Sequence, residues 1–215
     1  MLFRSPAQRG PRSSEVRAPA ELPYLAMAWQ VPTLRDPANE REPYALQVLA
    51  AVLDGYDGAR LTRRLVRDEQ LAVSVGAGYD GSGRGPSLFY LDGVPAPGRT
   101  VDELQAALRA ELQRVRDHGI SAEELARVKT QAIASRVYKR DSLMGQAMEI
   151  GYLESAGLSW RDEDRLLEGL RAVTADEVQA VARRYFDDAS LSIARLDPQP
   201  LGEQRPRSPF APARH

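Results

Sequence analysis

The chain has 215 residues, of which 43% are hydrophobic and 27% charged, which is ordinary for a globular protein. Its formal net charge of −1 gives no electrostatic reason to expect binding to nucleic acid or to an anionic membrane. There are no cysteines, so disulfides, zinc–thiolate sites and thiol nucleophiles are excluded. The two histidines, His118 and His215, lie far apart in the sequence and do not form the pattern of a catalytic metal site.

The two ends of the chain differ from its centre. Residues 1–19 are predicted to be a flexible arm and residues 198–215 a proline-rich tail, on either side of one folded domain over residues 20–197. The basic N-terminus is not followed by an apolar stretch, so we expect no signal peptide in this chain. No run approaches the roughly 20 apolar residues of a membrane span. We therefore expect a soluble protein, and the periplasm stays open as a location if the chain belongs to a longer protein.

The first half of the domain mixes strands and helices. Residues 25–31 alternate between large and small side chains up to Pro32, which predicts a strand. The apolar run over residues 44–53 predicts a buried helix, and a short arginine-rich helix is expected over residues 58–67. Alternation returns over residues 71–79 and 87–94. The glycine-rich turn between these two segments predicts a hairpin.

The second half is predicted to be mainly helical. Capping-box sequences begin at Thr100, Ser121 and Thr174, each followed by a helical pattern of apolar residues. The helices predicted in this half cover residues 100–119, 121–138, 142–157 and 174–185. Residues 191–194 alternate again and predict a closing strand. This order predicts an α+β domain with helices layered on a mainly antiparallel sheet, because the regular βαβ alternation of a Rossmann-like fold is missing.

Three glycines, Gly76, Gly78 and Gly81, match the G-x-G-x-x-G pattern of dinucleotide-binding loops. That pattern needs a helix N-terminus directly after the glycines, because the helix amides hold the pyrophosphate. Here a second strand follows instead, so we expect no dinucleotide binding. We interpret the glycines as small residues on one face of a strand, where a helix packs closely.

The segment from Asp54 to Tyr79, DGYDGARLTRRLVRDEQLAVSVGAGY, resembles the signature of M16 (insulinase/pitrilysin-like) zinc peptidase domains. In that signature a glycine-rich turn leads to an R-L helix, and an L-A-x-S-V segment then enters a strand. Residues 23–32 resemble the strand before the family's first helix, and residues 174–186 resemble the helix before its last strand. The likeness covers about residues 20–197 and implies a LuxS/mitochondrial-processing-peptidase-like domain.

Members of this family usually consist of two homologous domains that enclose the substrate, and the catalytic domain binds zinc through an H-x-x-E-H helix. This chain contains no H-x-x-E-H, and the corresponding run from Tyr44 to Leu53 has no histidine or acidic residue. The resemblance therefore implies the C-terminal, inactive type of domain. It implies no cofactor on this chain and zinc in a homologous partner domain or subunit.

The resemblance also implies a role: closing the peptidase chamber and contacting a peptide substrate, with no activity from this chain alone. In many family pairs the inactive domain supplies an arginine and, seven residues later, a tyrosine. Arg67 aligns with the arginine, whereas Val73 stands at the tyrosine position, next to a one-residue deletion. Arg67 and Tyr79 are thus the predicted substrate-binding residues. The alternative is a non-catalytic scaffold protein of the same fold, like the core subunits of respiratory complexes, and a homodimer also stays open.

Overall fold

The computed structural model describes residues 8–140 and 142–201, apart from the side chains of residues 136–140. Its centre is a five-stranded sheet with the order β1-β5-β2-β4-β3. The strands are β1 (Arg12–Pro19), β2 (Tyr24–Val31), β3 (Ala72–Tyr79), β4 (Ser87–Pro95) and β5 (Leu191–Gln199). Only the β1–β5 pairing is parallel, and the other three pairings are antiparallel. The predicted α+β class with a mainly antiparallel sheet is confirmed.

The described residues form six α-helices: α1 (Glu42–Asp54), α2 (Val101–His118), α3 (Ala122–Arg140), α4 (Leu143–Ala156), α5 (Glu163–Ala172) and α6 (Ala175–Tyr185). Two short helices complete them, the π-helix η1 (Thr62–Asp68) and the 3₁₀ helix η2 (Trp160–Asp162). The side chains of Thr100, Ser121 and Thr174 each accept a hydrogen bond from a backbone N–H three residues later. The glutamates at those later positions reach back to the capping backbones, so all three predicted capping boxes are confirmed.

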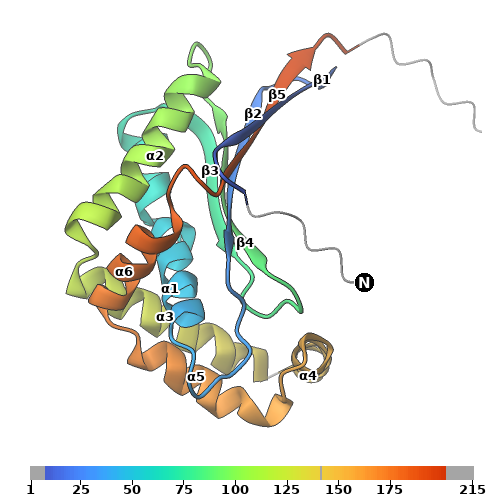
Figure 1. Ribbon diagram of the computed structural model, residues 1–215, viewed down its shortest axis with the longest axis vertical. Helices are drawn as coiled ribbons and strands as arrows, with labels where there is room; N and C mark the ends of the chain where they lie inside the picture. The colour runs from blue at the N-terminus through green and yellow to red at the C-terminus, as the bar shows by residue number, and fades with distance from the viewer. Residues whose placement is uncertain (1–7, 141, 202–215) are drawn as a thin grey trace, which may run out of the picture.

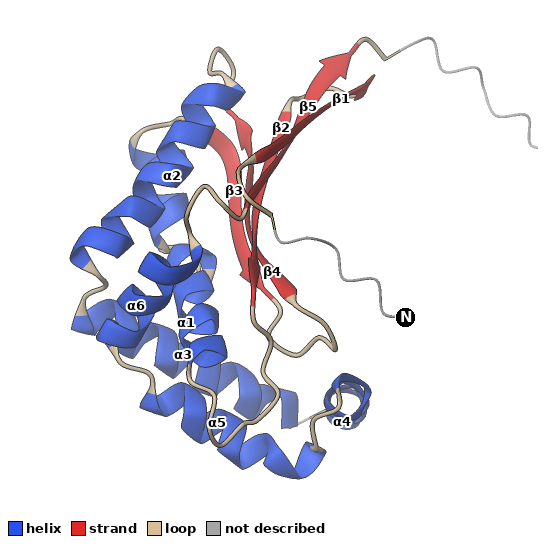
Figure 2. Cartoon of the chain, viewed as in Figure 1, coloured by secondary structure: helices blue, strands red, loops and turns tan. Residues whose placement is uncertain are grey.

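Helices α1, α2, α3, α5 and α6 form layers on one side of the sheet, whereas α4 lies apart from them, below the β3–β4 turn (Figure 1 and Figure 2). Helix α1 packs against β3, α2 against β4 and β2, and α6 against β2. Helices α3 and α5 pack behind α1, and α4 joins the body through α3. Since α1, α2 and α6 touch the strands directly, they decide which sheet residues are buried.

The core between helices and sheet follows from the alternation of the strands. Leu25, Met27 and Trp29 of β2 point toward the helices and are almost fully buried, as is Phe89 of β4. Phe186, just after α6, meets Trp29 and Phe89 edge to face, with ring centroids 5.2 and 4.7 Å apart. This aromatic cluster joins the two central strands to the end of α6.

The structure corrects three expectations. Residues 12–19, which were expected to belong to a flexible arm, form β1 and pair along their whole length with β5. These residues lack the alternating apolar side chains of a strand with one buried face, so the sequence pattern did not predict β1. The arginine-rich helix lies close to its expected position, but it is a π-helix over Thr62–Asp68, with Arg60 and Leu61 already helical before it. Helix α5 was not predicted, although Leu166 and Leu170 are buried one helical turn apart.

The two faces of β4 can be tested with neighbouring residues. Phe89→Ala is expected to lower the free energy of unfolding by about 3–5 kcal/mol, because it empties a fully buried aromatic site. Leu88→Ala, on the exposed face of the same strand, is expected to change it by less than about 0.5 kcal/mol. Urea unfolding followed by circular dichroism measures both values. Similar losses for the two variants would show that the burial of β4 is assigned wrongly.

Candidate functional site

The sheet face that points away from the helices carries a row of exposed side chains. Tyr24 of β2 and Leu88 and Tyr90 of β4 are 39%, 54% and 47% exposed. The register places small residues around them: Ala28 of β2 and Gly78 of β3 lie on either side of Tyr90. We call this surface, formed by alternate residues of all five strands, the open face. This side of the sheet faces right in Figure 2, away from α1, α2 and α6.

The only carboxylate of the described strands on the open face belongs to Asp92, on β4 two residues after Tyr90. The Tyr24 hydroxyl donates a hydrogen bond to Asp92 Oδ2 at 2.6 Å. Burial, and then the hydrogen bond to Asp92, raise the pKa of Tyr24 to about 12. Tyr24 therefore stays protonated at neutral pH and continues to donate its hydrogen bond to Asp92.

The two strand glycines face this side of the sheet. A Cβ at Gly76 would lie 2.6 Å from Asp92 Oδ1, and a Cβ at Gly78 would overlap the Tyr90 ring. The glycines thus make room for two side chains of β4 that lie across β3. The expectation that a helix packs on them is wrong, because the helices cover the other face.

A shallow depression lies beside Tyr90 on the open face. Its volume is about 240 Å³, and its walls come from β1, β2, β4 and β5. Small residues such as Ser14, Ala26, Ala28 and Ala194 form most of its floor, and Arg12 lies at its β1 side. Small side chains of β1, β2 and β5 create this hollow, and the larger Tyr90 of β4 borders it.

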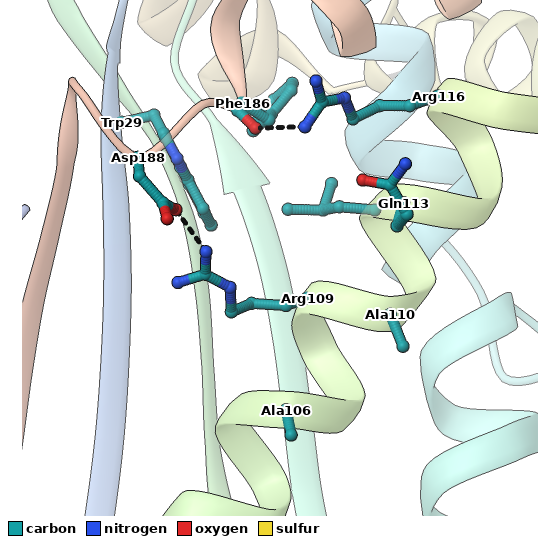
Figure 3. A pocket seen from close by; sticks show the side chains of 9 residues that line it. Trp29, Ala106, Arg109, Ala110, Gln113, Arg116, Phe186 and Asp188 are labelled. Carbon is teal, nitrogen blue, oxygen red and sulfur yellow. Dashed lines mark hydrogen bonds and ion pairs between the residues drawn. The ribbon is translucent and has the colours of Figure 1, made fainter.

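Figure 3 shows a second pocket, of about 300 Å³, between α2 and the segment that follows α6. Its polar groups bind one another: Arg109 pairs with Asp188, and Arg116 donates a hydrogen bond to the Phe186 carbonyl at 3.1 Å. Trp29 closes the pocket and donates its indole N–H to the Asp187 carbonyl at 3.1 Å. Because these polar groups already bind one another, the pocket fixes α2 to the segment between α6 and β5 and is not a ligand site.

The arginine-rich segment around η1 has two kinds of members. Arg60 forms a two-pronged ion pair with Glu124, at 2.6 and 2.7 Å, and is largely buried. Arg64 lies 2.7 Å from the buried carboxylate of Glu111. Arg63 and Arg67 are exposed, and neither forms an ion pair or side-chain hydrogen bond with a described residue. Only these last two have a free guanidinium to offer a ligand.

Glu111 of α2 is the one acidic side chain of the described chain that is almost fully buried, with 1% exposed. Burial raises the pKa of its carboxyl, and the neighbouring Arg64 and Arg114 oppose that rise. Both arginines form ion pairs with it. The Glu111 carboxylate is neutralised by Arg64 and Arg114 inside the helical layer. It therefore holds η1 to α2 and is not exposed to a ligand.

The two predicted substrate-binding residues lie at opposite ends of β3. Arg67 lies on η1, before the strand begins, and Tyr79 is the last of the eight residues of β3, a strand about 23 Å long at 3.3 Å per residue. Tyr79 packs toward the core: its ring stacks on Phe89 and its hydroxyl donates to the Pro32 carbonyl at 2.6 Å. Burial raises its pKa. The structure does not bring Arg67 and Tyr79 together.

Tyr79 lines a further pocket, of about 380 Å³, beside α1, α4 and α5. Val73, at the position where the family pattern has a tyrosine, is 52% exposed and sits at an irregularity in the β3–β4 register. The open-face residues Tyr24, Tyr90 and Asp92 were not predicted. An aspartate within a strand was the available signal, because strands are depleted in aspartate.

Comparison with known proteins gives a consistent picture. Residues 2–132 match the family model described as the Peptidase M16 inactive domain. A protease from Helicobacter pylori is similar in structure, with a TM-score of 0.82 and 20% identity over 90% of this chain and 46% of that chain. The inactive peptidase domain of a putative zinc protease from Bordetella parapertussis has a TM-score of 0.73 and 21% identity over 89% of this chain and 98% of that chain.

A chain of complex III2 from Candida albicans is also similar, with a TM-score of 0.68 and 18% identity over 87% of this chain and 45% of that chain. The chain thus spans about half the length of the Helicobacter and Candida chains. Comparison with curated protein sequences gives no match. Within the described residues, no group of three or more metal-binding side chains converges, and no helix has the length and apolar character needed to cross a bilayer.

The Arg60–Glu124 pair gives a pH-dependent prediction. Hydrogen bonds from Arg60 are the main cause that lowers the pKa of Glu124 from 4.5 to about 2. Because the folded pKa is the lower one, the stabilisation is present above pH 4.5 and is lost as the pH falls toward 2. Arg60→Gln is expected to cost about 1–3 kcal/mol at pH 7 and progressively less below pH 4.5.

Urea unfolding between pH 7 and pH 2 measures the difference between the wild-type chain and the variant. Arg63→Gln, which removes an exposed arginine nearby, is the matched control and is expected to have little effect at any pH. A loss for Arg60→Gln that does not shrink in acid would contradict the assigned role of Glu124.

Proposed function

Because the chain belongs to the M16 peptidase inactive-domain family, we propose that it is the non-catalytic domain or subunit of an M16-type zinc metallopeptidase. Its part is to close the chamber and to offer a peptide-binding surface. The zinc and the catalytic base come from a homologous domain that carries H-x-x-E-H, which this chain lacks.

The observation that carries this proposal is the open face. A sheet whose other side is packed against three helices is a rigid support, and its free side presents Tyr24, Leu88 and Tyr90 to a ligand. Exposed aromatic and aliphatic side chains on a fixed frame bind without a large loss of conformational entropy. Such a surface can orient a peptide for a reaction whose chemical groups lie elsewhere.

Arg67 is the residue of this chain that we propose to contact the peptide. It is exposed at the end of η1, directly before β3, and its guanidinium is not bound to another described side chain. π-Helical segments are rare and are frequently found at functional sites. Tyr79 stays a prediction, since its hydroxyl already binds the Pro32 carbonyl.

A second candidate function is a scaffold role without peptide chemistry. Its support is the similarity to a chain of complex III2, an assembly in which the matching chain is twice as long as this one. The two candidates differ in what a partner gains from this chain: catalytic activity in the first, and only assembly in the second.

Reconstitution tests the proposal. The chain is mixed with a separately expressed H-x-x-E-H domain from the same genome, and cleavage of a quenched fluorescent peptide library is followed. We expect no cleavage by this chain alone and an increase of about 10²-fold in the partner's activity when both are present, because substrate positioning contributes on that scale. A chelator is expected to abolish the activity. A stable complex without any gain in cleavage would favour the scaffold role, and chelator-sensitive cleavage by this chain alone would contradict both.

The role of Arg67 is tested in the same assay. Arg67→Ala is expected to lower kcat/KM of the pair by about tenfold, because one charged contact to the substrate is lost. Arg63→Ala is the matched control, since both arginines are exposed on η1 and unpaired. Equal activity of the two variants would exclude a substrate contact at Arg67.

A further inference from the structure

Charge on the open face is concentrated at two points. Among the described strand residues that point to this side, Asp92 is the only acidic one and Arg12 the only basic one. The other charged residues of β1 and β5 point to the opposite side or lie at its margin: Arg195 pairs with Asp102 of α2, and Arg17 pairs with Asp197. Asp92 is thus the single carboxylate that the strands place on this mostly apolar surface. Asp54 of α1, which accepts a hydrogen bond from the Ala77 amide at the edge of β3, adds a second negative charge close enough to interact with Asp92.

Asp92 has one oxygen committed and one available. Its Oδ2 accepts the hydroxyl of Tyr24 at 2.6 Å. Its Oδ1 lies over Gly76, where no side chain rises, and receives no hydrogen bond from a described residue. On the other side, the neighbour across the ladder is Ala26, which is also small. An incoming donor can therefore reach Oδ1 without displacing a side chain.

The space next to Asp92 is shaped for an apolar stem. Ala26 and Tyr90 both adjoin Asp92 and both line the depression of about 240 Å³. Asp92 itself does not line the depression. The methylene groups of a long side chain can lie on the alanine floor while its end extends past Ala26 to the Asp92 carboxylate beside the depression. Lysine and arginine combine such a stem with a terminal charge.

We propose that the open face holds the side chain of an arginine or lysine of an extended peptide, with the cationic end at Asp92 Oδ1 and the stem over Ala26 and beside Tyr90. This inference rests on the proposed function, since it names the class of side chain that the peptide-binding surface selects.

Three features favour a basic side chain over other occupants. The carboxylate of Asp92 supplies the opposite charge, and the hydroxyl of Tyr24 holds that carboxylate in place. The rings of Tyr24 and Tyr90 are exposed beside it, and aromatic faces attract cations. Arg12, at the β1 side of the depression, repels a cation and so directs the charged end toward Asp92. An acidic side chain would be repelled by the carboxylate of Asp92 and by the aromatic faces, and attracted by Arg12 instead.

The test uses the full chain labelled with ¹⁵N and two blocked pentapeptides, Ac-Ala-Ala-Arg-Ala-Ala-NH₂ and the same peptide with citrulline in place of arginine. Citrulline has almost the same shape but no charge. NMR titration is expected to shift the amides of Gly76 and Asp92, and to give a Kd about fivefold lower for the arginine peptide. Binding of both peptides with equal Kd, or of neither, would overturn the proposal.

Asp92→Asn is the matching variant, because the amide oxygen still accepts the Tyr24 hydroxyl while the charge is removed. It is expected to bind both peptides with the same Kd. Asp176→Asn, on α6 in the helical layer, changes the net charge equally and is expected to keep the fivefold preference. Loss of the preference in both variants would assign it to net charge and overturn the role of Asp92.

These outcomes are independent of reconstitution. The titration needs neither the partner domain nor cleavage, so an arginine preference can be present while the pair shows no peptidase activity. Conversely, activation of the partner on neutral peptides together with equal Kd values would support the proposed function and remove only the basic subsite.

Discussion

The structure depends on one constraint: successive residues of a strand point to opposite faces of the sheet. On β2 and β4, large apolar side chains at alternate positions, such as Met27 and Leu91, pack under the helices. Phe89 and Trp29 meet Phe186 there. The intervening residues are then forced to the other side, where no helix of the described residues covers β2 and β4. The helical core and the open face are two results of the same alternation.

The small residues of the open face have a reason in this arrangement. Gly76 and Gly78 lie where the side chains of Asp92 and Tyr90 cross β3, and larger residues there would push both away from the sheet. Ala26 and Ala28 occupy the corresponding positions on β2. The polar and aromatic groups of β4 therefore stand in a shallow surface that a ligand can approach, supported from behind by the packed core.

Charged residues divide between support and exposure. Arg60 and Arg64 bind the carboxylates of Glu124 and Glu111 and tie the segment around η1 to α2 and α3. Arg67, a few residues further on, is left exposed next to the start of β3. The paired arginines fix the backbone from which the Arg67 side chain extends. The chain lacks the zinc motif, and what it presents instead is a rigid sheet surface with a small number of exposed charged side chains.

The sequence by itself determined the α+β class, the three capping boxes, the strands β2 to β4 and the absence of H-x-x-E-H, because each is a local pattern of residue types. It did not show β1, whose polar residues have no buried row and are held by pairing with β5, 180 residues later. Nor did it show that Tyr24 and Asp92 meet, or that Tyr79 packs into the core. Those contacts depend on strand register and on the side that the helices cover, which only the tertiary structure decided.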